Sequence, residues 1–155
     1  MSGTEATRLL LFDGNNLVQR SYWAMAGASL HDSRNRPTGA LYGTIKAFLG
    51  TLKELHPTHC LWLFDDGKSD MRTALRPDYK GHRKYSATAT GDPRVELPPQ
   101  FDALRAFFSE ISVAHWSQRG VEADDLIAHV VKSLKWPEKL SLIHISEPTR
   151  RYAIS

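Results

Sequence analysis

The chain has 155 residues, of which 41% are hydrophobic and 24% are charged, and its formal net charge is +3. This length and composition fit one ordinary hydrophobic core and require no second domain. Cys60 is the only cysteine, which excludes a disulfide framework, and the sequence has neither a signal-peptide pattern nor an apolar run of about 20 residues. We therefore expect a cytoplasmic protein with no membrane partner.

Short apolar runs alternate with helical patterns along the chain, as they do in parallel α/β sheets. A first strand is predicted at residues 8–12, and a turn-forming cluster and a helix over 17–25 follow it. A second helix is predicted over 41–55, and a strand buried on both faces over 59–64. The apolar stripe of the second helix, expected to face the core, is Leu41, Ile45, Phe48, Leu49, Leu52 and Leu55.

The second half of the chain begins with residues 66–98, which lack a sustained period and are rich in glycine and proline. They are predicted to form a long basic loop or arch, since a loop of this length in a compact domain is often functional. A third helix is expected over 101–111, a short strand over 113–116 and a last helix over about 122–134. The side of the third helix expected to be apolar carries Phe101, Leu104, Phe107, Phe108 and Ile111.

Acidic residues stand at three corresponding places in this pattern. Asp13 and Asp65 each end an apolar strand, and Glu122, Asp124 and Asp125 open the last helix. The carboxyl ends of parallel strands share one edge, and Glu122 and Asp125 are spaced to share a helical face, so these acids should lie close together. Crowded carboxylates need a cation, and oxygen-only donors favour magnesium or manganese over zinc. The alternative is that these acids only cap helices and form turns.

Cations gather between the second strand and the third helix. They are Arg72, Arg76, Lys80, Arg83 and Lys84. With the ring of Tyr79 among them, they suit phosphates and stacked bases, although a solvated basic loop has the same composition. Arg20, one or two helical turns after the first acidic turn, can reach a phosphate near the acids. A metal-carboxylate site beside such a loop most economically indicates phosphodiester hydrolysis.

Five motifs in this order resemble the 5′-nuclease family, which includes the N-terminal domain of bacterial DNA polymerase I and the phage flap endonucleases. The motifs are Asp-Gly-Asn-Asn at 13–16, Thr-Gly-Ala-Leu-Tyr-Gly at 38–43, Phe-Asp at 64–65, Pro-Asp-Tyr-Lys-Gly-His-Arg at 77–83 and Gly-Val-Glu-Ala-Asp-Asp at 120–125. The resemblance implies a three-layer, PIN-like (Rossmann-like) α/β fold with a parallel central sheet. It also implies a metal-dependent 5′-3′ exonuclease or flap endonuclease that acts on branched or 5′-ended DNA in replication and repair.

The resemblance also assigns roles to individual residues. It implies that two magnesium or manganese ions are held by Asp13, Asp65, Glu122, Asp124 and Asp125. Arg20 and Lys80 match the cations at the scissile phosphate. The expected substrate contacts are Tyr79, Lys80, Arg83, Lys84, Arg72 and Arg76. Asp66, just beyond the matching acid, is a weaker candidate for an outer position around the metal site.

The resemblance ends near residue 136, where the family pattern implies a further strand with a second acidic turn and then a helix-hairpin-helix element. Residues 140–155 instead resemble a translated sequencing adaptor, so we expect a nuclease portion at 1–139 followed by an artefactual tail. A natural short variant is the alternative. The tail begins with alternating apolar residues that could take the place of the missing strand.

Three functional classes stay open on the sequence. They are a structure-specific DNA nuclease, an inert nucleic-acid-binding fragment with too few acids for two metals, and another PIN-like nuclease that acts on RNA. The Tyr79–Arg83 motif argues against the last of these. Oligomerisation is not implied.

Overall fold

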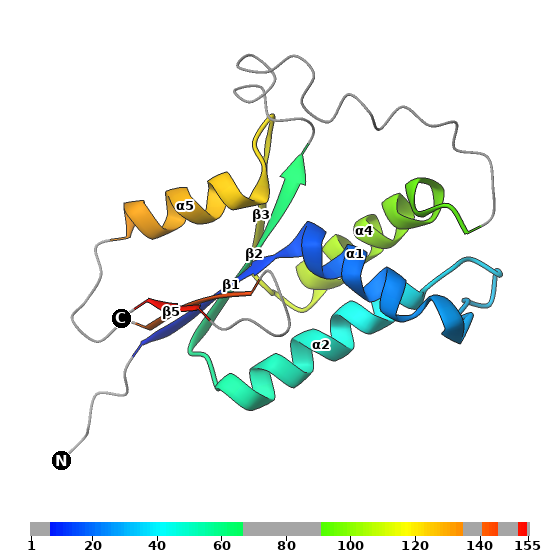
Figure 1. Ribbon diagram of the computed structural model, residues 1–155, viewed down its shortest axis with the longest axis horizontal. Helices are drawn as coiled ribbons and strands as arrows, with labels where there is room; N and C mark the ends of the chain where they lie inside the picture. Colours follow the sequence, from blue (N-terminus) through cyan, green and yellow to red (C-terminus); the bar gives the residue numbers. More distant parts are fainter. Residues whose placement is uncertain (1–6, 67–90, 135–140, 146–151, 155) are drawn as a thin grey trace.

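The computed structural model describes residues 7–66, 91–134, 141–145 and 152–154. Helices lie on both faces of a central sheet (Figure 1). The elements in chain order are β1 (Arg8–Asp13), α1 (Gly14–Ala24), a short 3-10 helix η1 (Ala26–Ala28), α2 (Gly39–Leu55), β2 (His59–Asp66), α4 (Pro93–Glu110), β3 (His115–Arg119), α5 (Ala123–Ser133), β4 (Ser141–Ile145) and β5 (Tyr152–Ile154).

The sheet has the strand order β3-β2-β1-β4-β5. The first four strands in this order are parallel, and β5 runs antiparallel to β4. Helices α1, α2 and α4 cover one face and α5 covers the other, as Figure 1 shows. The predicted three-layer α/β fold with a parallel central sheet is therefore confirmed.

The central strands bury alternate side chains on opposite faces, as the period of two in a β-strand requires. Leu10 and Phe12 face α1, α2 and α4, whereas Leu11 faces α5. The Phe12 ring stacks on Trp62 of the neighbouring strand with 4.5 Å between ring centroids. Burial on both faces explains why β1 and β2 appear in the sequence as nearly continuous apolar runs.

The second helix is present as α2, and its predicted apolar stripe faces the core at every position but one. Phe48 is buried at the centre of its inner face, and the other apolar residues of the predicted stripe pack beside it, but Leu49 is 58% exposed. Successive helical residues are about 100° apart, so the residue after Phe48 turns away from the sheet. The helix ends at Leu55, and the next residue, His56, caps it in a left-handed conformation (φ 45°) just before Pro57.

Helix α4 begins at Pro93, so the prediction of a loop up to residue 98 is wrong at its end. Asp92 caps the helix by accepting a hydrogen bond of 2.9 Å from the Arg94 N–H, and proline is favoured in the first helical turn. Pro98, the last proline of the predicted loop, lies inside the helix together with Pro99. Two residues expected on the apolar side of this helix are exposed, namely Phe107 (37%) and Ile111 (49%).

Strand β3 starts at His115, two residues later than predicted. The chain between α4 and β3 first closes the end of the helix, because the Val113 N–H donates to the Phe108 carbonyl at 2.8 Å. Pairing with β2 begins only at His115, which lies opposite Trp62.

Strand β4 takes the place on the free side of β1 that the tail was expected to be able to fill. Its residues pair in parallel with β1, with Ser141 opposite Arg8 and Ile145 opposite Phe12. The origin of residues 140–155 stays a prediction. Within the described part of the chain, no helix is both long and apolar enough to cross a membrane.

Gly14 provides a test of how tightly α1 packs on β2. A Cβ atom at this position would lie 2.3 Å from the ring of Phe64, which is fully buried. We predict that Gly14→Ala lowers the free energy of unfolding by about 1–3 kcal/mol through overpacking, measured by urea denaturation. Gly50→Ala, where a Cβ meets no atom within 4 Å, is the control and should gain about 0.5–1 kcal/mol. Equal stability of Gly14→Ala and wild type would contradict the packing described.

Candidate functional site

The five predicted metal-site acids lie at the carboxyl ends of β1 and β2 and at the start of α5, which we call the acid edge. Asp13 is the buried last residue of β1, and Asp65 is half-buried near the end of β2. Glu122 is buried and immediately precedes α5. Asp124 is exposed and Asp125 half-buried in the first turn of that helix.

Hydrogen bonds tie the three acidic segments together. The Asp65 N–H donates to Asn15 Oδ1 at 2.9 Å, which joins β2 to the start of α1. Asp65 Oδ1 accepts from the Ala123 N–H at 2.7 Å, which joins β2 to the start of α5. The fold therefore brings the three segments to one place, as the shared edge of a parallel sheet predicts.

The starts of two helices stabilise the carboxylates at this edge. Asp13 Oδ1 accepts the Asn16 N–H at 2.9 Å and so caps α1, while Asp65 takes an N–H of the first turn of α5. Free N–H groups and the positive end of the helix dipole both favour negative charge at these positions. The capping alternative thus describes Asp13 correctly, but capping and cation binding are compatible because a carboxylate has further lone pairs.

Sequence reasoning missed Asn15, whose side chain carries one of these links. The motif at 13–16 predicts a turn cluster, whereas the structure passes directly from β1 into α1. The sequence feature that could have indicated this link is an asparagine in the first turn after the strand. A short amide side chain at that position can reach the end of the neighbouring strand.

Burial and two neighbouring carboxylates oppose the ionisation of Asp13. Burial is the main reason that the pKa of Asp13 rises from 3.8 to about 6, and the charges of Asp124 and Asp65 raise it further. The N–H groups of Asn15 and Asn16 lower it in part. Asp13 therefore lies close enough to Asp65 and Asp124 for their charges to oppose its ionisation.

The acid of α5 that acts on Asp13 is Asp124, not one of the pair singled out by helical spacing. The helix begins at Ala123, and Glu122 has extended backbone angles (φ −85°, ψ 154°) as the residue before it. Spacing within a helix gives the relative directions of side chains but not the rotation of the helix against the sheet, and that rotation selects Asp124.

The donor chemistry of the acid edge fits a hard divalent cation, since the acids offer only oxygen ligands. In residues 7–66 and 91–134, no three acidic, histidine or cysteine side chains stand close enough to hold a metal ion as placed. Asp13 and Asp65 are fixed by main-chain N–H groups, whereas Asp124 is exposed and can adopt other rotamers. Asp13 and Asp65 are thus held in direction, whereas the side chain of Asp124 is adjustable.

The predicted cations are only partly described by the structure. Arg20 lies exposed on α1, and within the described residues it forms no ion pair with the acids. Asp66, the weaker candidate, is exposed at the end of β2, where its carbonyl accepts the Gly120 N–H at 2.8 Å. The other predicted substrate contacts lie outside the described residues: Arg72, Arg76, Tyr79, Lys80, Arg83 and Lys84.

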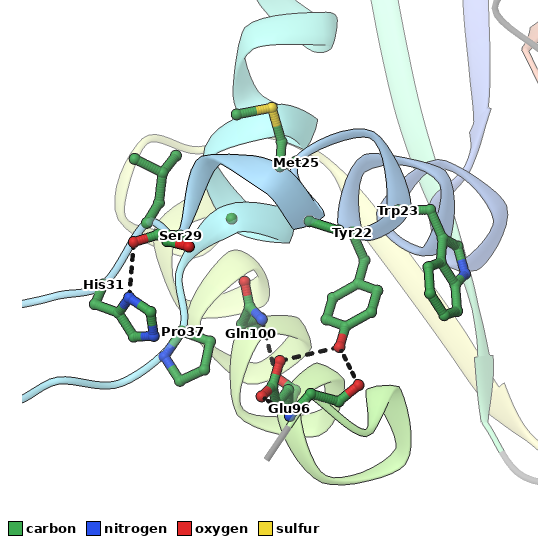
Figure 2. Close-up of a pocket in the computed structure, with 12 residues that line it drawn as sticks. Tyr22, Trp23, Met25, Ser29, His31, Pro37, Glu96 and Gln100 are labelled. Atoms are coloured by element: carbon green, nitrogen blue, oxygen red, sulfur yellow. Dashed lines mark hydrogen bonds between the residues drawn. The ribbon is translucent and has the colours of Figure 1, made fainter.

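A pocket of about 290 Å³ lies where the end of α1 meets the starts of α2 and α4 (Figure 2). It has apolar walls from residues such as Met25 and Pro37 and polar groups from Glu96 and Gln100. The Gln100 side chain is already engaged, because Oε1 accepts the Leu41 N–H at 3.1 Å and Nε2 donates to the Glu96 carbonyl at 3.0 Å. The Gln100 side chain therefore links α4 to the start of α2 at the wall of this pocket.

Four parallel strands, helices on both faces and acids at the strand ends define a three-layer α/β domain with an acidic site at one sheet edge. The chain belongs to the family described as 5′-3′ exonuclease, N-terminal resolvase-like domain, whose family model matches residues 8–147. The resemblance inferred from the five motifs is thus confirmed.

Curated relatives and a solved structure show how far the similarity extends. DNA polymerase I of Bacillus subtilis is 31% identical over 130 residues, which cover 84% of this chain and 14% of the relative. A 5′-3′ exonuclease of the same organism is 33% identical over 123 residues, covering 77% of this chain and 39% of the relative. The flap endonuclease of bacteriophage T5, solved with DNA and metal ions, shares the fold at a TM-score of 0.61 with 23% identity, over 94% of this chain and 57% of that protein. The chain thus spans well under half the length of these curated relatives.

The pKa of Asp13 predicts how stability depends on pH. A carboxyl whose pKa is higher in the folded than in the unfolded state destabilises the fold when ionised, so stability should fall as pH rises from about 4 to above 6. At about 1.4 kcal/mol per pKa unit, the penalty at pH 7.5 is about 2–3 kcal/mol. Asp13→Asn keeps the helix-capping oxygen and removes the charge, so it should be more stable than wild type by about this amount at pH 7.5 and nearly equal near pH 4.

Urea unfolding in metal-free buffer at both pH values measures this effect. Asp102→Asn is the matched control, since the Asp102 side chain is 78% exposed on α4 and should show no such gain. An Asp13→Asn variant that is less stable than wild type at pH 7.5 would contradict the prediction.

Proposed function

We propose that this chain is the N-terminal portion of a metal-dependent, structure-specific 5′-3′ nuclease that hydrolyses phosphodiesters of flap-like or 5′-ended DNA in replication and repair. Its family, whose members include 5′-3′ exonucleases, supports this proposal. The shared fold with a flap endonuclease solved with DNA and metal ions is consistent with it.

The observation that carries the proposal is the pair of hydrogen bonds made by Asp65. Its N–H is held by Asn15 and its carboxylate by Ala123, so acids from three separate segments meet at one edge of the sheet. Oxygen ligands gathered at a sheet edge, without histidine or cysteine, suit magnesium or manganese. When bound, such ions activate water and stabilise the leaving oxygen of a phosphodiester.

The residues of the chain have separate roles in this proposal. Asp13 and Asp65 form the fixed part of the metal site, and the α5 acids complete it: Glu122, Asp124 and Asp125. Arg20, exposed on the helix that begins at Asp13, binds a phosphate near the scissile bond together with Lys80. The remaining substrate contacts are assigned by the family resemblance alone: Tyr79, Arg83, Lys84, Arg72 and Arg76.

Metal binding gives the first test of this function. Magnesium or manganese should raise the melting temperature of the chain because the ion neutralises carboxylates that repel one another. The stabilisation is about 2.7 kcal/mol at about a hundredfold excess of metal over its Kd. Thermal unfolding with increasing metal should show this shift in wild type and in the exposed control Asp102→Asn. The shift should be small or absent in Asp13→Asn and Asp65→Asn.

Nuclease assays on labelled flap DNA and single-stranded RNA test the substrate. Any cleavage by this chain should require magnesium or manganese, prefer the DNA flap and be lost in Asp13→Asn. Equal cleavage of the flap in excess chelator would overturn metal dependence, and preferential cleavage of RNA would overturn the choice of substrate.

The assignment of Lys80 and Arg83 to phosphate contacts predicts a distinct effect of their removal. The double variant Lys80→Ala, Arg83→Ala should bind flap DNA more weakly, and the slope of log Kd against log salt should become shallower by about 1–2, because up to two phosphate contacts are lost. Thermal stability should change little. A large loss of stability with unchanged affinity would show that these residues act in folding.

A further inference from the structure

Among the residues that the structure describes, Trp23 is the most exposed large apolar side chain, at 64%. It lies near the end of α1, whose opposite side is buried through residues such as Leu17, Val18 and Tyr22. A single exposed apolar side chain is common in soluble proteins, but an indole combines a large flat face with one polar group. The position of Trp23 on the helix, together with its exposure, indicates a function.

Trp23 shares the exposed face of α1 with Arg20. The two residues are three positions apart and so lie on the same side of the helix, where Gln19 and Ala24 are also exposed. Helix α1 begins directly after Asp13. At a rise of 1.5 Å per residue, Arg20 and Trp23 lie about 10 Å and about 15 Å along the helix from that acid. A DNA strand with one phosphate at the acid edge is long enough to reach both side chains.

The Trp23 ring is held in direction by its neighbour in the chain. It meets the Tyr22 ring edge to face, with 5.2 Å between the ring centroids and 84° between the ring planes. Tyr22 is itself fixed, because its hydroxyl lies 2.9 Å from the carbonyl oxygen of Gly91 and 3.0 Å from Glu96 Oε2. A side chain that is already ordered loses little conformational entropy when it binds a partner.

There is space for a flat partner beside the Trp23 ring. Trp23 lines one side of the pocket of about 290 Å³ at the end of α1, next to Tyr22 (Figure 2). This volume is close to the lower end of the range for small-molecule sites, about 300–1,000 Å³. A single flat ring system therefore fits against the indole without displacing a part of the described fold.

A ring and a cation on one helix face suit single-stranded nucleic acid. Bases of a single strand stack on aromatic side chains, and a neighbouring cation binds the phosphates of the same strand. Stacking on a side chain needs a base with a free face, which a base inside a continuous duplex lacks. The combination of Trp23 and Arg20 thus fits an unpaired stretch of DNA better than the interior of a duplex.

We propose that Trp23 stacks on an unpaired base of the DNA substrate while Arg20 binds a phosphate of the same strand. This inference rests on the proposed function. At a rise of about 3.4 Å for each stacked nucleotide, the base lies within about five nucleotides of the phosphate at the acid edge. Trp23 is then a specificity-determining residue, because it contributes to binding only where the DNA offers an unpaired base at that distance.

The first test measures the Kd for a labelled flap DNA at fixed salt. Trp23→Leu removes the ring and keeps apolar bulk, so it should weaken binding about fivefold to a hundredfold, and Trp23→Phe should restore most of the affinity. Trp116→Leu is the matched control: it removes an indole that is 37% exposed on β3 and should leave the Kd unchanged. The melting temperatures of the Trp23 variants should stay close to that of wild type, because the side chain is largely exposed.

Abasic DNA separates stacking from a structural effect of the substitution. In a series of flap DNAs, each base of the unpaired arm in turn is replaced by a tetrahydrofuran abasic analogue. At one position, loss of the base should weaken binding by wild type about as much as Trp23→Leu does, and the two changes together should weaken it no further. A Trp23→Leu effect of equal size on every DNA of the series would overturn the inference, and so would an unchanged Kd on the intact flap.

Failure of this inference and failure of the proposed function give different results. If wild type binds flap DNA and cleaves it with magnesium while Trp23→Leu binds as tightly, the stacking role is overturned and the proposed function stands. If the abasic series shows the expected coupling but cleavage continues in excess chelator, the stacking role stands and metal dependence is overturned. A chain that does not bind flap DNA at all overturns both.

Discussion

The hydrogen bond between the Asp65 carboxylate and the Ala123 N–H is the contact on which the arrangement of the site depends. It fixes the start of α5, on one face of the sheet, to the end of a strand whose N–H is held by Asn15 of α1, on the other face. One residue thereby connects all three layers at the acid edge. Main-chain N–H groups hold the key carboxylates, so the fixed part of the site forms without help from a cation.

The core supplies the stability that this edge costs. Burial and neighbouring charge raise the pKa of Asp13, and ionising it at neutral pH opposes folding. Directly behind it, Phe12 stacks on Trp62 and meets Phe48 edge to face at 5.3 Å, within the buried core cluster. Functional sites typically combine a destabilising polar edge with a densely packed apolar core, because the packing of the core offsets the free energy that the polar edge costs.

The sequence predicted the elements that depend on local apolar pattern and missed those that depend on tertiary context. Strands β1 and β2 and helix α2 follow from continuous or periodic apolar runs. The start of α4 could not be predicted because prolines occupy its first turns. Proline is favoured at the first helical position but usually breaks a helix further in, so its presence alone does not tell whether a helix begins or is interrupted. The choice of Asp124 over its neighbours could not be predicted, since the rotation of α5 on the sheet is set by which of its apolar residues meet Leu11 and Leu63.

The acid edge has a fixed half and an adjustable half, and this division follows from burial. Asp13 is 8% exposed and Asp65 is half-buried, while Asp124 and Arg20 are exposed on helices that start at the same edge. A buried carboxylate held by N–H groups keeps its direction but cannot follow a moving charge, whereas an exposed side chain can change rotamer at little cost. The proposed function, in which the site holds a cation and also accepts and releases a polyanion, needs both properties. The parallel sheet provides the first at its strand ends, and the helix starts provide the second.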